Sequence, residues 1–472
     1  MNKGIRFGTS GFRGIIGDNW TKENIRTIAH AFRQKAEADG KKVTIVVGYD
    51  NRFMGRESAE WFCEAVCSDK IQVIFMNVSV PTPFVAFGAT TYDYGVIMTA
   101  SHNPYFYNGI KVFLKGGKEM SDEFCLQLSQ NIANPKGYPD ANFSELVKSG
   151  RITLSDDTDD YVNKVVGLAD AKTIRAAKIK VLFNPMNGSG SEITKKIFNK
   201  LGVNYQCMND GIDPYFGGSL PCPYPHKLTD MVKRVLDGKF DLGIALDGDG
   251  DRIAVIDRDG RIYDCNYLHA ILYYYLVAVK GQKGGIVKTT HCSNLGVRLC
   301  AKYGYESHEV PVGYKNIAPV LEQTNSLIGA ESGGMGFKAV SLQKDGIAPA
   351  AVIIDLVSAL KKGITELIKE VGALVDFQSE FLEYAYPFAA EAREKILEKF
   401  KGEPPKFAQK VIRREALGDG YKIIFEGDYW CMARVSGNEN AARLYAEMST
   451  SKECGEIIAK LEKHHGFSER QK

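Results

Sequence analysis

The 472-residue sequence predicts an α/β protein with three similar α/β domains, whose sheets are mixed and mainly parallel, and a C-terminal α+β domain, all around a central cleft. Two observations lead to this prediction. A chain of this length is too long for one ordinary hydrophobic core and suits several domains of about a hundred residues each. Strand-like and helix-like segments also alternate through most of the chain, which favours parallel strands joined by right-handed crossovers.

Hydrophobic periodicity places the elements of the three α/β repeats. Short apolar runs between turn residues indicate buried strands, and apolar residues spaced three or four apart indicate helices. In the first repeat these patterns predict strands at 43–48, 72–76 and 95–98 and helices at 56–68 and 82–90. In the second repeat they predict a strand at 178–183, a helix at 191–201 and another strand that ends just before Asp247. In the third repeat they predict strands at 285–288, 306–310 and 326–329.

The C-terminal part of the chain breaks this alternation. Neighbouring short strands are expected at 421–426, 429–435 and 443–447, and a helix is expected at 452–463. Adjacent strands followed by a helix favour a smaller α+β domain. We therefore predict four domains, which are residues 1–147, 148–260, 261–372 and 373–472.

Composition narrows the class of protein. The chain is 44% hydrophobic and 25% charged and has a net charge of +3, as in a globular protein close to neutrality. Neither a nucleic acid nor a membrane is expected as a partner, because the chain has no marked basic excess. The N-terminus lacks the apolar core of a leader, and the most apolar run, residues 267–279, contains His269 and is too short to span a bilayer. We expect a soluble, cytoplasmic protein.

The stretch 98–104, Met-Thr-Ala-Ser-His-Asn-Pro, is the first candidate for a functional site. A strand-like run leads into this polar turn, which Pro104 ends, so Ser101 is expected at the carboxyl end of a strand. Open α/β sheets bind their ligands at that edge. The same composition also suits an ordinary strand-to-loop turn, so this stretch by itself leaves both interpretations open.

A second candidate follows another apolar, strand-like run. Asp247, Asp249 and Asp251 stand at alternate positions, and the glycines between them let the backbone curl until the three carboxylates converge. Hard divalent cations bind such oxygen ligands, and without a cation the three charges would repel one another. An EF-hand calcium loop needs glycine at its sixth position and glutamate at its twelfth, whereas Arg252 and Arg258 stand there. The pattern therefore predicts a divalent-cation site of another kind.

Five motifs occur in the order expected of one enzyme superfamily. They are Phe7-Gly-Thr-Ser-Gly-Phe-Arg-Gly, Thr99-Ala-Ser-His-Asn-Pro, Asp247-Gly-Asp-Gly-Asp-Arg, Glu331-Ser-Gly-Gly and Arg434-Val-Ser-Gly. On these motifs the sequence resembles the α-D-phosphohexomutases, and among them the phosphoglucomutase/phosphomannomutase type. The resemblance extends from about residue 4 to about residue 450, and five ordered motifs are far more specific than any one of them.

The resemblance implies a phosphoserine mechanism. Such an enzyme lends its own phosphate to a sugar phosphate and takes back the other one, and the serine that carries it here is Ser101. The implied metal ligands are Asp247, Asp249 and Asp251 with an oxygen of the phosphorylated Ser101, and Mg²⁺ is the expected ion. The implied partner is a small-molecule sugar phosphate, with a hexose 1,6-bisphosphate as activator.

The resemblance also implies a set of cations around the phosphoryl group. Arg13, Lys111 and Arg252 would place fixed positive charge where negative charge spreads during transfer. His102 invites a serine–histidine dyad, but the side chains of sequence neighbours are expected to point apart. We interpret His102 as a residue that shapes the catalytic loop and contacts the phosphate.

Sugar recognition is implied for the loop at Glu331 and Ser332. The family's usual loop has a glutamate where this chain has Ala330, so either Glu331 replaces that contact through a shifted loop or sugar discrimination differs. Gly313 and Lys315 belong to a neighbouring segment that resembles the family's second substrate-facing loop of this domain.

The base that removes the proton of the sugar hydroxyl is not assigned. Some family members have a histidine after the Ser-Gly of the sugar loop, whereas this chain has Gly334. Lys344, in a Lys-Asp-Gly segment typical of glucose-type members, is expected to bind substrate. It is a candidate base only if neighbouring cations lower its pKa.

A distal phosphate site is implied for the fourth domain. Arg434, Ser436 and Gly437 match the family's phosphate-binding motif, and Arg443 is grouped with them as a binding residue. Asn438 stands where the family has a threonine, although its amide can still donate a hydrogen bond. We expect weaker or altered phosphate binding with function retained.

The predicted function is interconversion of the 1- and 6-phosphates of glucose, with mannose as a further substrate. A phosphoglucosamine mutase would share every catalytic motif. A phosphatase or a phosphosugar-binding protein would result if the changes at Ala330 and Asn438 have removed turnover. A nucleotide-binding enzyme is disfavoured, because residues 8–14 lack the G-x-G-x-x-G spacing. The sequence leaves open whether the protein is a monomer or a dimer.

Overall fold

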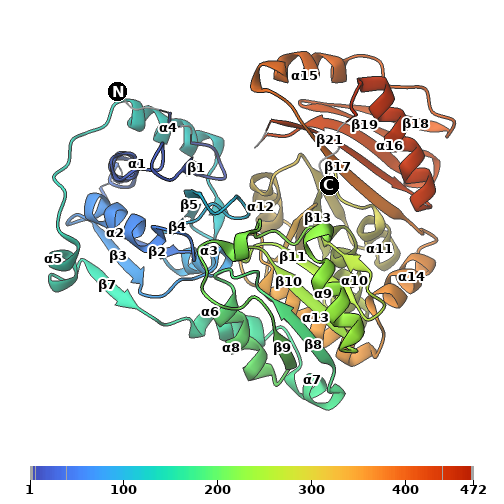
Figure 1. Cartoon of the computed structure of the whole chain (residues 1–472), viewed down its shortest axis with the longest axis horizontal. Helices are drawn as coiled ribbons and strands as arrows, with labels where there is room; N and C mark the ends of the chain where they lie inside the picture. The colour runs from blue at the N-terminus through green and yellow to red at the C-terminus, as the bar shows by residue number, and fades with distance from the viewer. Residues whose placement is uncertain (1–3, 6, 39, 438–439, 469–472) are drawn as a thin grey trace.

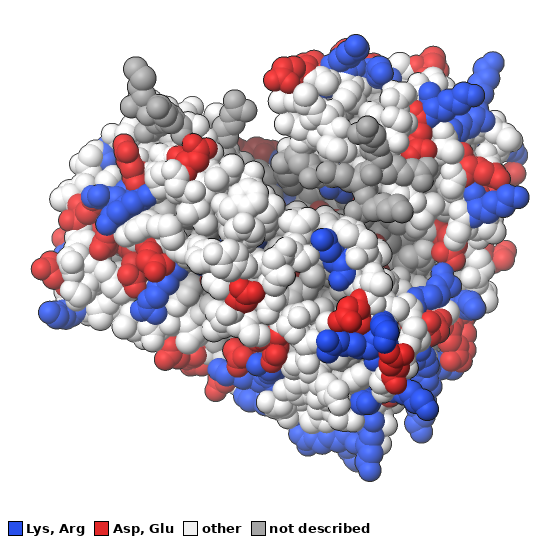
Figure 2. All heavy atoms as spheres, viewed as in Figure 1, with Lys and Arg blue, Asp and Glu red and all other residues white. Residues whose placement is uncertain are grey.

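The computed structural model describes residues 4–5, 7–38, 40–437 and 440–468. Four sheets with their helices follow one another along the chain (Figure 1). Three sheets are mixed and the fourth is antiparallel, which confirms the predicted fold class. Figure 2 shows a notch between the first domain and the fourth, which is the hollow expected of a central cleft.

The first sheet has the strand order β1–β5–β4–β2–β3–β7, with β6 paired beside β5. Strands β4, β2, β3 and β7 are parallel, whereas β5 and β1 run antiparallel to their neighbours. Its strands are β1 (Phe12–Ile15), β2 (Val43–Tyr49), β3 (Ile71–Met76), β4 (Tyr94–Met98), β5 (Tyr107–Leu114), β6 (Lys118–Glu119) and β7 (Ile152–Ser155). Its helices are α1 (Lys22–Ala36), α2 (Gly55–Val66), α3 (Thr82–Thr91), α4 (Asp122–Ala133) and α5 (Phe143–Lys148). Because β7 pairs with β3, this sheet continues past residue 147.

The central strands of this sheet are apolar on both faces, as is typical of buried parallel strands. Ile45 and Val47 pack with α1 and α2, whereas Val46 packs with α3 on the opposite face. Helix α1 begins after Thr21, whose hydroxyl accepts a hydrogen bond from the backbone N–H of Asn24 at 3.2 Å. The strands and helices predicted for this repeat are confirmed to within two residues.

The second sheet has the order β12–β11–β10–β8–β9, in which β10, β8 and β9 are parallel. Its strands are β8 (Lys180–Asn184), β9 (Asn204–Cys207), β10 (Leu242–Leu246), β11 (Ile253–Asp257) and β12 (Ile262–Tyr263). Its helices are α6 (Asp159–Val166), α7 (Ala171–Ala177), α8 (Ser191–Leu201) and α9 (Thr229–Asp237). Helix α8 has the predicted bounds, because Gly202 ends it with a left-handed φ of 74°.

The third sheet has the order β14–β13–β15–β16. Its strands are β13 (Gly285–Thr289), β14 (Ser307–Val310), β15 (Ser326–Glu331) and β16 (Gly334–Phe337). The associated helices are α10 (Cys265–Tyr274), the π-helix η3 (Tyr275–Val279), α11 (Leu295–Tyr303), α12 (Tyr314–Gln323), α13 (Ile347–Leu360) and α14 (Ile364–Leu374). Almost every residue of α13 is buried, and one apolar cluster joins it to α3 and to the second and third domains. The first three domains therefore share a core.

The fourth sheet is antiparallel, in the order β17–β21–β20–β19–β18. Its strands are β17 (Glu380–Pro387), β18 (Val411–Leu417), β19 (Gly420–Phe425), β20 (Trp430–Val435) and β21 (Ala441–Met448), and its helices are α15 (Arg393–Lys401) and α16 (Ser451–His465). The sequence predicted β19, β20, β21 and α16 but not β17 or β18, whose residues are mostly half-buried or exposed and give little apolar alternation.

Alternation along the strands gives the fourth sheet two different faces. Both helices cover one face, which has its own apolar core. Trp430, Met432 and Tyr445 lie on the other face and pack with Val312 of the third domain. Among the described residues, none of the helices combines the length and apolarity needed to cross a bilayer.

Candidate active site

Ser101 lies in the turn after β4, as predicted, and is buried, with 1% of its surface exposed. Its backbone N–H donates a hydrogen bond to Thr99 Oγ1 at 2.9 Å. Its Oγ lies 3.4 Å from Asp247 Oδ2 and also 3.4 Å from His102 Nδ1. Ser101 has a left-handed φ of 54°, and its side chain lies beside that of His102. The expectation that these two neighbouring side chains point apart is therefore wrong.

Arg52 holds this turn in place and was not predicted from the sequence. Its guanidinium is buried, and Nε lies 3.2 Å from the Asp50 carboxylate, which also accepts a hydrogen bond from Thr99 Oγ1 at 2.6 Å. The guanidinium donates to the carbonyl oxygens of Ser101 at 2.6 Å, Asn103 at 2.7 Å, Pro104 at 2.8 Å and Tyr107 at 3.1 Å. The position of Arg52 just after β2, at the ligand-binding edge of the sheet, is the signal that could have found it.

The three predicted carboxylates converge in the turn after β10. Asp247, Asp249 and Asp251 are buried, and one oxygen from each lies within 4.8 Å of the others. Gly250 has a φ of 72°, which lets the chain turn back between the last two aspartates. A Cβ at Gly248 would lie 2.9 Å from the carbonyl oxygen of Ser101, so glycine is needed for this turn and the serine turn to pack together.

Three cations lie beside the carboxylates or the serine turn. Lys111 Nζ, on β5, lies 2.6 Å from Asp249 Oδ2 and 2.9 Å from Asp251 Oδ2. Arg252 Nε lies 4.0 Å from both Asp247 Oδ2 and Asp251 Oδ1. Arg13, on β1, donates a hydrogen bond to the Asn103 side chain of the serine turn. The structure thus brings together all three cations that were predicted to act here.

Protonation states in this cluster follow from burial and charge. Burial and the neighbouring carboxylates of Asp249 and Asp251 raise the pKa of Asp247 well above its ordinary value. Burial also opposes ionisation of Asp249, but the Lys111 ammonium lowers the pKa of Asp249 overall. Burial and then the Arg252 and Arg13 guanidiniums lower the pKa of His102 well below its usual range. His102 is therefore a neutral imidazole beside the Ser101 hydroxyl.

The carboxylate cluster has the donor set that a hard divalent cation requires. Asp249 Oδ1 and Asp251 Oδ1 are buried oxygens with no hydrogen-bond partner among the described residues. Unpartnered buried carboxylate oxygens are costly unless a cation satisfies them. Mg²⁺ takes oxygen ligands and leaves part of its shell to water and phosphate oxygens, which suits one oxygen from each aspartate with an oxygen of a phosphorylated Ser101. The residues present therefore fit the expected ion.

The sugar loop connects β15 and β16. Glu331 Oε1, at the end of β15, lies 3.0 Å from Lys344 Nζ. Ala330 is fully buried in the apolar core, so it offers the cleft no polar contact. Ser332 Oγ donates to Glu383 Oε2 of the fourth domain at 2.8 Å and accepts a hydrogen bond from Asn266 Nδ2 at 3.1 Å. Neither Glu383 nor Asn266 was predicted from the sequence.

Lys344 does not meet the condition for acting as the base that removes the proton of the sugar hydroxyl. Burial disfavours its charged form, but the carboxylates of Glu331, Asp251 and Glu119 raise the pKa of Lys344 above its ordinary value. The condition was a pKa lowered by neighbouring cations, and the nearby carboxylates have the opposite effect. Lys344 is therefore an ammonium group held beside the sugar loop.

The second predicted loop of the third domain begins α12. Gly313 has a φ of 114° and lies at the start of this helix, where a side chain would be strained. Lys315 Nζ, in the first turn of α12, lies 2.7 Å from Asp122 Oδ1 of α4. Lys315 thus links the third domain to the first across the molecule and does not contact Glu331 or Ser332 in the described interactions.

The predicted distal phosphate loop follows β20. Arg434 and Arg443 stand directly opposite each other on β20 and β21, on the sheet face that turns toward the third domain. Arg434 donates two hydrogen bonds to Asp419 Oδ2, at 2.6 and 3.0 Å, and Arg443 pairs with Glu383. The Ser436 carbonyl accepts a hydrogen bond from Arg393 at 2.9 Å. Gly437 follows on the surface, and Asn438 lies outside the described residues.

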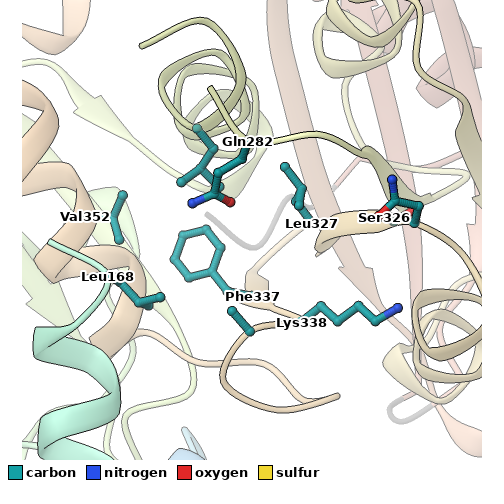
Figure 3. Close-up of a pocket in the computed structure, with 10 residues that line it drawn as sticks. Leu168, Gln282, Ser326, Leu327, Phe337, Lys338 and Val352 are labelled. Carbon is teal, nitrogen blue, oxygen red and sulfur yellow. The ribbon is translucent and has the colours of Figure 1, made fainter. Parts of the chain in front are cut away.

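A separate pocket of about 250 Å³ lies at the other end of β15 (Figure 3). The side chains of Gln282 and Phe337 point into it, whereas the Lys338 side chain extends away. Ser326 and Leu327 line the pocket at the start of β15, while Glu331 ends the same strand. The pocket therefore lies about 17 Å along the strand from the sugar loop, at the usual rise per residue, and is not part of the site.

A buried serine beside a carboxylate cluster and fixed cations is typical of enzymes that transfer phosphoryl groups. Comparison with known proteins defines the class further. Models of the phosphoglucomutase/phosphomannomutase α/β/α domains I, II and III match residues 4–138, 159–260 and 264–373. The chain therefore belongs to the α-D-phosphohexomutase superfamily, whose members are sugar-phosphate mutases, and it is an intramolecular phosphotransferase.

Relatives with two different names match nearly the whole chain. A phosphoglucomutase/phosphomannomutase from Thermococcus kodakarensis is 27% identical over 96% of this chain and 97% of its own length. A phosphoglucosamine/phosphogalactosamine mutase from Sulfurisphaera tokodaii is 29% identical over 98% of this chain and 99% of its own. A solved phosphoglucomutase/phosphomannomutase family protein from Burkholderia thailandensis is 21% identical and covers 98% of this chain and 100% of its own, with a TM-score of 0.80. The last likeness supports the fold alone.

Proposed function

We propose that the protein interconverts hexose 1-phosphates and hexose 6-phosphates, with glucose as the preferred sugar and mannose as a further substrate. Ser101 carries the phosphoryl group, and a hexose 1,6-bisphosphate serves as both intermediate and activator. Each domain contributes one loop: the serine turn, the carboxylate turn, the sugar loop and the distal phosphate loop. The partner is a small-molecule sugar phosphate.

The observation that carries this proposal is the position of the Ser101 hydroxyl, which lies 3.4 Å from the Asp247 carboxylate. Lys111 bonds the other two carboxylates of the same cluster, Asp249 and Asp251. A serine that only formed the turn after a strand would not need a carboxylate cluster and a buried lysine beside it. Fixed cations beside the carboxylate cluster would stabilise the charge that develops on the serine oxygen and the transferring group. Asp247, Asp249 and Asp251 would hold Mg²⁺, which supplies further charge neutralisation when bound.

Each group of residues has a step in the proposed cycle. The phosphoryl group leaves Ser101 Oγ for the free hydroxyl of the bound sugar phosphate, and Lys111, Arg13 and Arg252 stabilise the charge in flight. The sugar bisphosphate then turns around, and its other phosphoryl group returns to Ser101. Neutral His102 can accept a hydrogen bond from the Ser101 hydroxyl between the two transfers.

Arg434, Ser436 and Gly437 bind the phosphate that is not being transferred, with Asn438 and Arg443 as further contacts. Glu331, Ser332 and Lys344 face the sugar, and Gly313 and Lys315 belong to the neighbouring loop. A carboxylate–ammonium pair such as Glu331–Lys344 offers both an acceptor and a donor to sugar hydroxyls.

Glucosamine phosphate is the second candidate substrate. The relatives carry names of both kinds at similar identity, and the catalytic residues suit either sugar. The Lys-Asp-Gly segment at Lys344 favours glucose mildly, because it matches glucose-type members of the family.

The test is a coupled assay with Mg²⁺ and catalytic glucose 1,6-bisphosphate. The 1-phosphates of glucose, mannose and glucosamine are supplied separately, and formation of each 6-phosphate is measured. We expect conversion of glucose 1-phosphate well above the others, and loss of turnover in Ser101→Ala with binding of sugar phosphate retained. Turnover undiminished in Ser101→Ala would disprove the phosphoserine mechanism. Binding without conversion by the wild type would support a phosphosugar-binding protein instead.

A further inference from the structure

Glu383 joins the sugar loop to the distal phosphate loop. It stands on β17, on the face of the fourth sheet that turns toward the third domain. Its Oε2 accepts a hydrogen bond from Ser332 Oγ at 2.8 Å, and its Oε1 accepts one from Arg443. A residue of the fourth domain thus supplies a carboxylate at the point where the third domain is expected to recognise the sugar.

We propose that Glu383 is a specificity-determining residue, which accepts a hydrogen bond from one ring hydroxyl of the bound hexose phosphate. This inference rests on the proposed mutase function and names the group that selects the sugar. The substrate class it implies is a hexose phosphate with a free hydroxyl at the position that faces Ser332 and Glu383.

Glu331, the other carboxylate at the sugar loop, is less exposed than Glu383. Glu331 lies 3.0 Å from the Lys344 ammonium, and both side chains are 14% exposed. Ala330 has no polar group and is buried in the core. Glu383 is more open, with 23% of its side chain exposed. Of these two carboxylates, Glu383 is therefore the more accessible to a ligand.

The hydrogen-bond capacity of Ser332 and Glu383 limits which sugar group they can bind. An ionised carboxylate has about four acceptor positions, and the described contacts of Glu383 use two of them. Because a carboxylate cannot donate, the proton of the Ser332 hydroxyl is committed to Glu383. Ser332 Oγ also accepts from Asn266 Nδ2, which leaves it one acceptor position. Ser332 and Glu383 together present acceptors only, so they select a sugar group that donates.

The test compares kcat/KM for glucose 1-phosphate and for its analogues that lack the hydroxyl at C2, C3 or C4. The wild type is expected to disfavour one analogue by about tenfold or more, because a site built to bond a hydroxyl is left with an unpaired polar group. Glu383→Gln keeps the size of the side chain but removes its charge. In this variant the preference at that one position should fall several-fold, while the preferences at the other two positions stay as in the wild type.

Glu380→Gln is the matched control. Glu380 also stands on β17 and bonds the third domain, through Arg261 Nη2 at 3.2 Å and the Tyr267 hydroxyl at 3.4 Å, but it does not contact the sugar loop. The control is expected to leave all three preferences unchanged. Thermal unfolding of both variants confirms that each is folded.

Two outcomes overturn the inference and can be told apart. Equal losses for every analogue in Glu383→Gln would mean that Glu383 only holds the two domains together, and the mutase function would stand. A wild type that converts neither glucose 1-phosphate nor any other hexose 1-phosphate would refute the mutase function, and the inference would fail with it.

Discussion

Arg52→Lys tests whether the serine turn must be held by a guanidinium. Arg52 donates to four carbonyl oxygens of the turn and pairs with Asp50. Lysine keeps the positive charge, but its ammonium has three donors at a single point and cannot span the same set of carbonyls. We therefore expect the turn to lose at least two of these hydrogen bonds while the charge pair survives.

The size of the effect follows from these contacts. Hydrogen bonds to a charged group contribute about 1.5–3 kcal/mol each, so the loss of two predicts destabilisation of about 3 kcal/mol or more. A displacement of the Ser101 hydroxyl by about 1 Å would lower kcat by roughly a hundredfold. The measurements are thermal unfolding, kcat in the coupled assay, and the fraction of phosphorylated protein by intact mass.

Arg56→Lys, four residues further along and in the first turn of α2, provides a control. Arg56 bonds Glu60 and the carbonyl of Asn77 and does not touch the serine turn, so its substitution should leave kcat nearly unchanged. If Arg52→Lys also retained more than half of the wild-type kcat and unfolded at the same temperature, the guanidinium would not be needed to position Ser101.

Two further predictions concern stability. Mg²⁺ at a hundred times its Kd should stabilise the wild type by about 2.7 kcal/mol in thermal unfolding, and Asp251→Asn should largely remove this effect; an equal effect in the variant would place the ion elsewhere. Burial lowers the pKa of Lys422 from its ordinary 10.5 to about 8. The unfolded chain therefore binds more protons between these values, and stability should rise with pH through the window by up to about 3 kcal/mol. Lys422→Met should lack this rise in urea titrations, and an unchanged pH profile would contradict the assignment.

The sequence predicted those elements whose signals are local. Strand β2 contains the apolar run Ile45-Val46-Val47, and α8 has apolar residues at helical spacing with Gly202 directly after its end. The turns that carry Ser101 and the three aspartates were predicted for the same reason, because each follows a short apolar strand. Strands β17 and β18 were missed because their residues are only partly buried, so their pairing partners determine them more than their own pattern does.

Contacts between distant parts of the chain were not predictable from local patterns. Arg52 reaches carbonyls about fifty residues away, and Glu383 meets Ser332 from another domain. The protonation of Lys344 also depended on such contacts, since its sequence neighbours do not include Glu331 or Glu119. The residues of each motif indicated the chemistry of the site. The geometry of the site and the pKa values of its residues depend on neighbours that tertiary packing brings together.

Charge balance explains why the serine turn and the carboxylate turn can pack so closely. Three buried carboxylates beside one another would be strongly unfavourable by themselves. When all three aspartates are ionised, as a bound cation requires, Lys111, Arg252 and Arg13 bring as many positive charges to the cluster as the aspartates bring negative ones. A divalent cation and a phosphoryl dianion together add no net charge, whereas either of them alone would disturb the balance. The site is therefore electrostatically suited to hold the cation and the phosphorylated serine at the same time, which is the state that the proposed transfer requires.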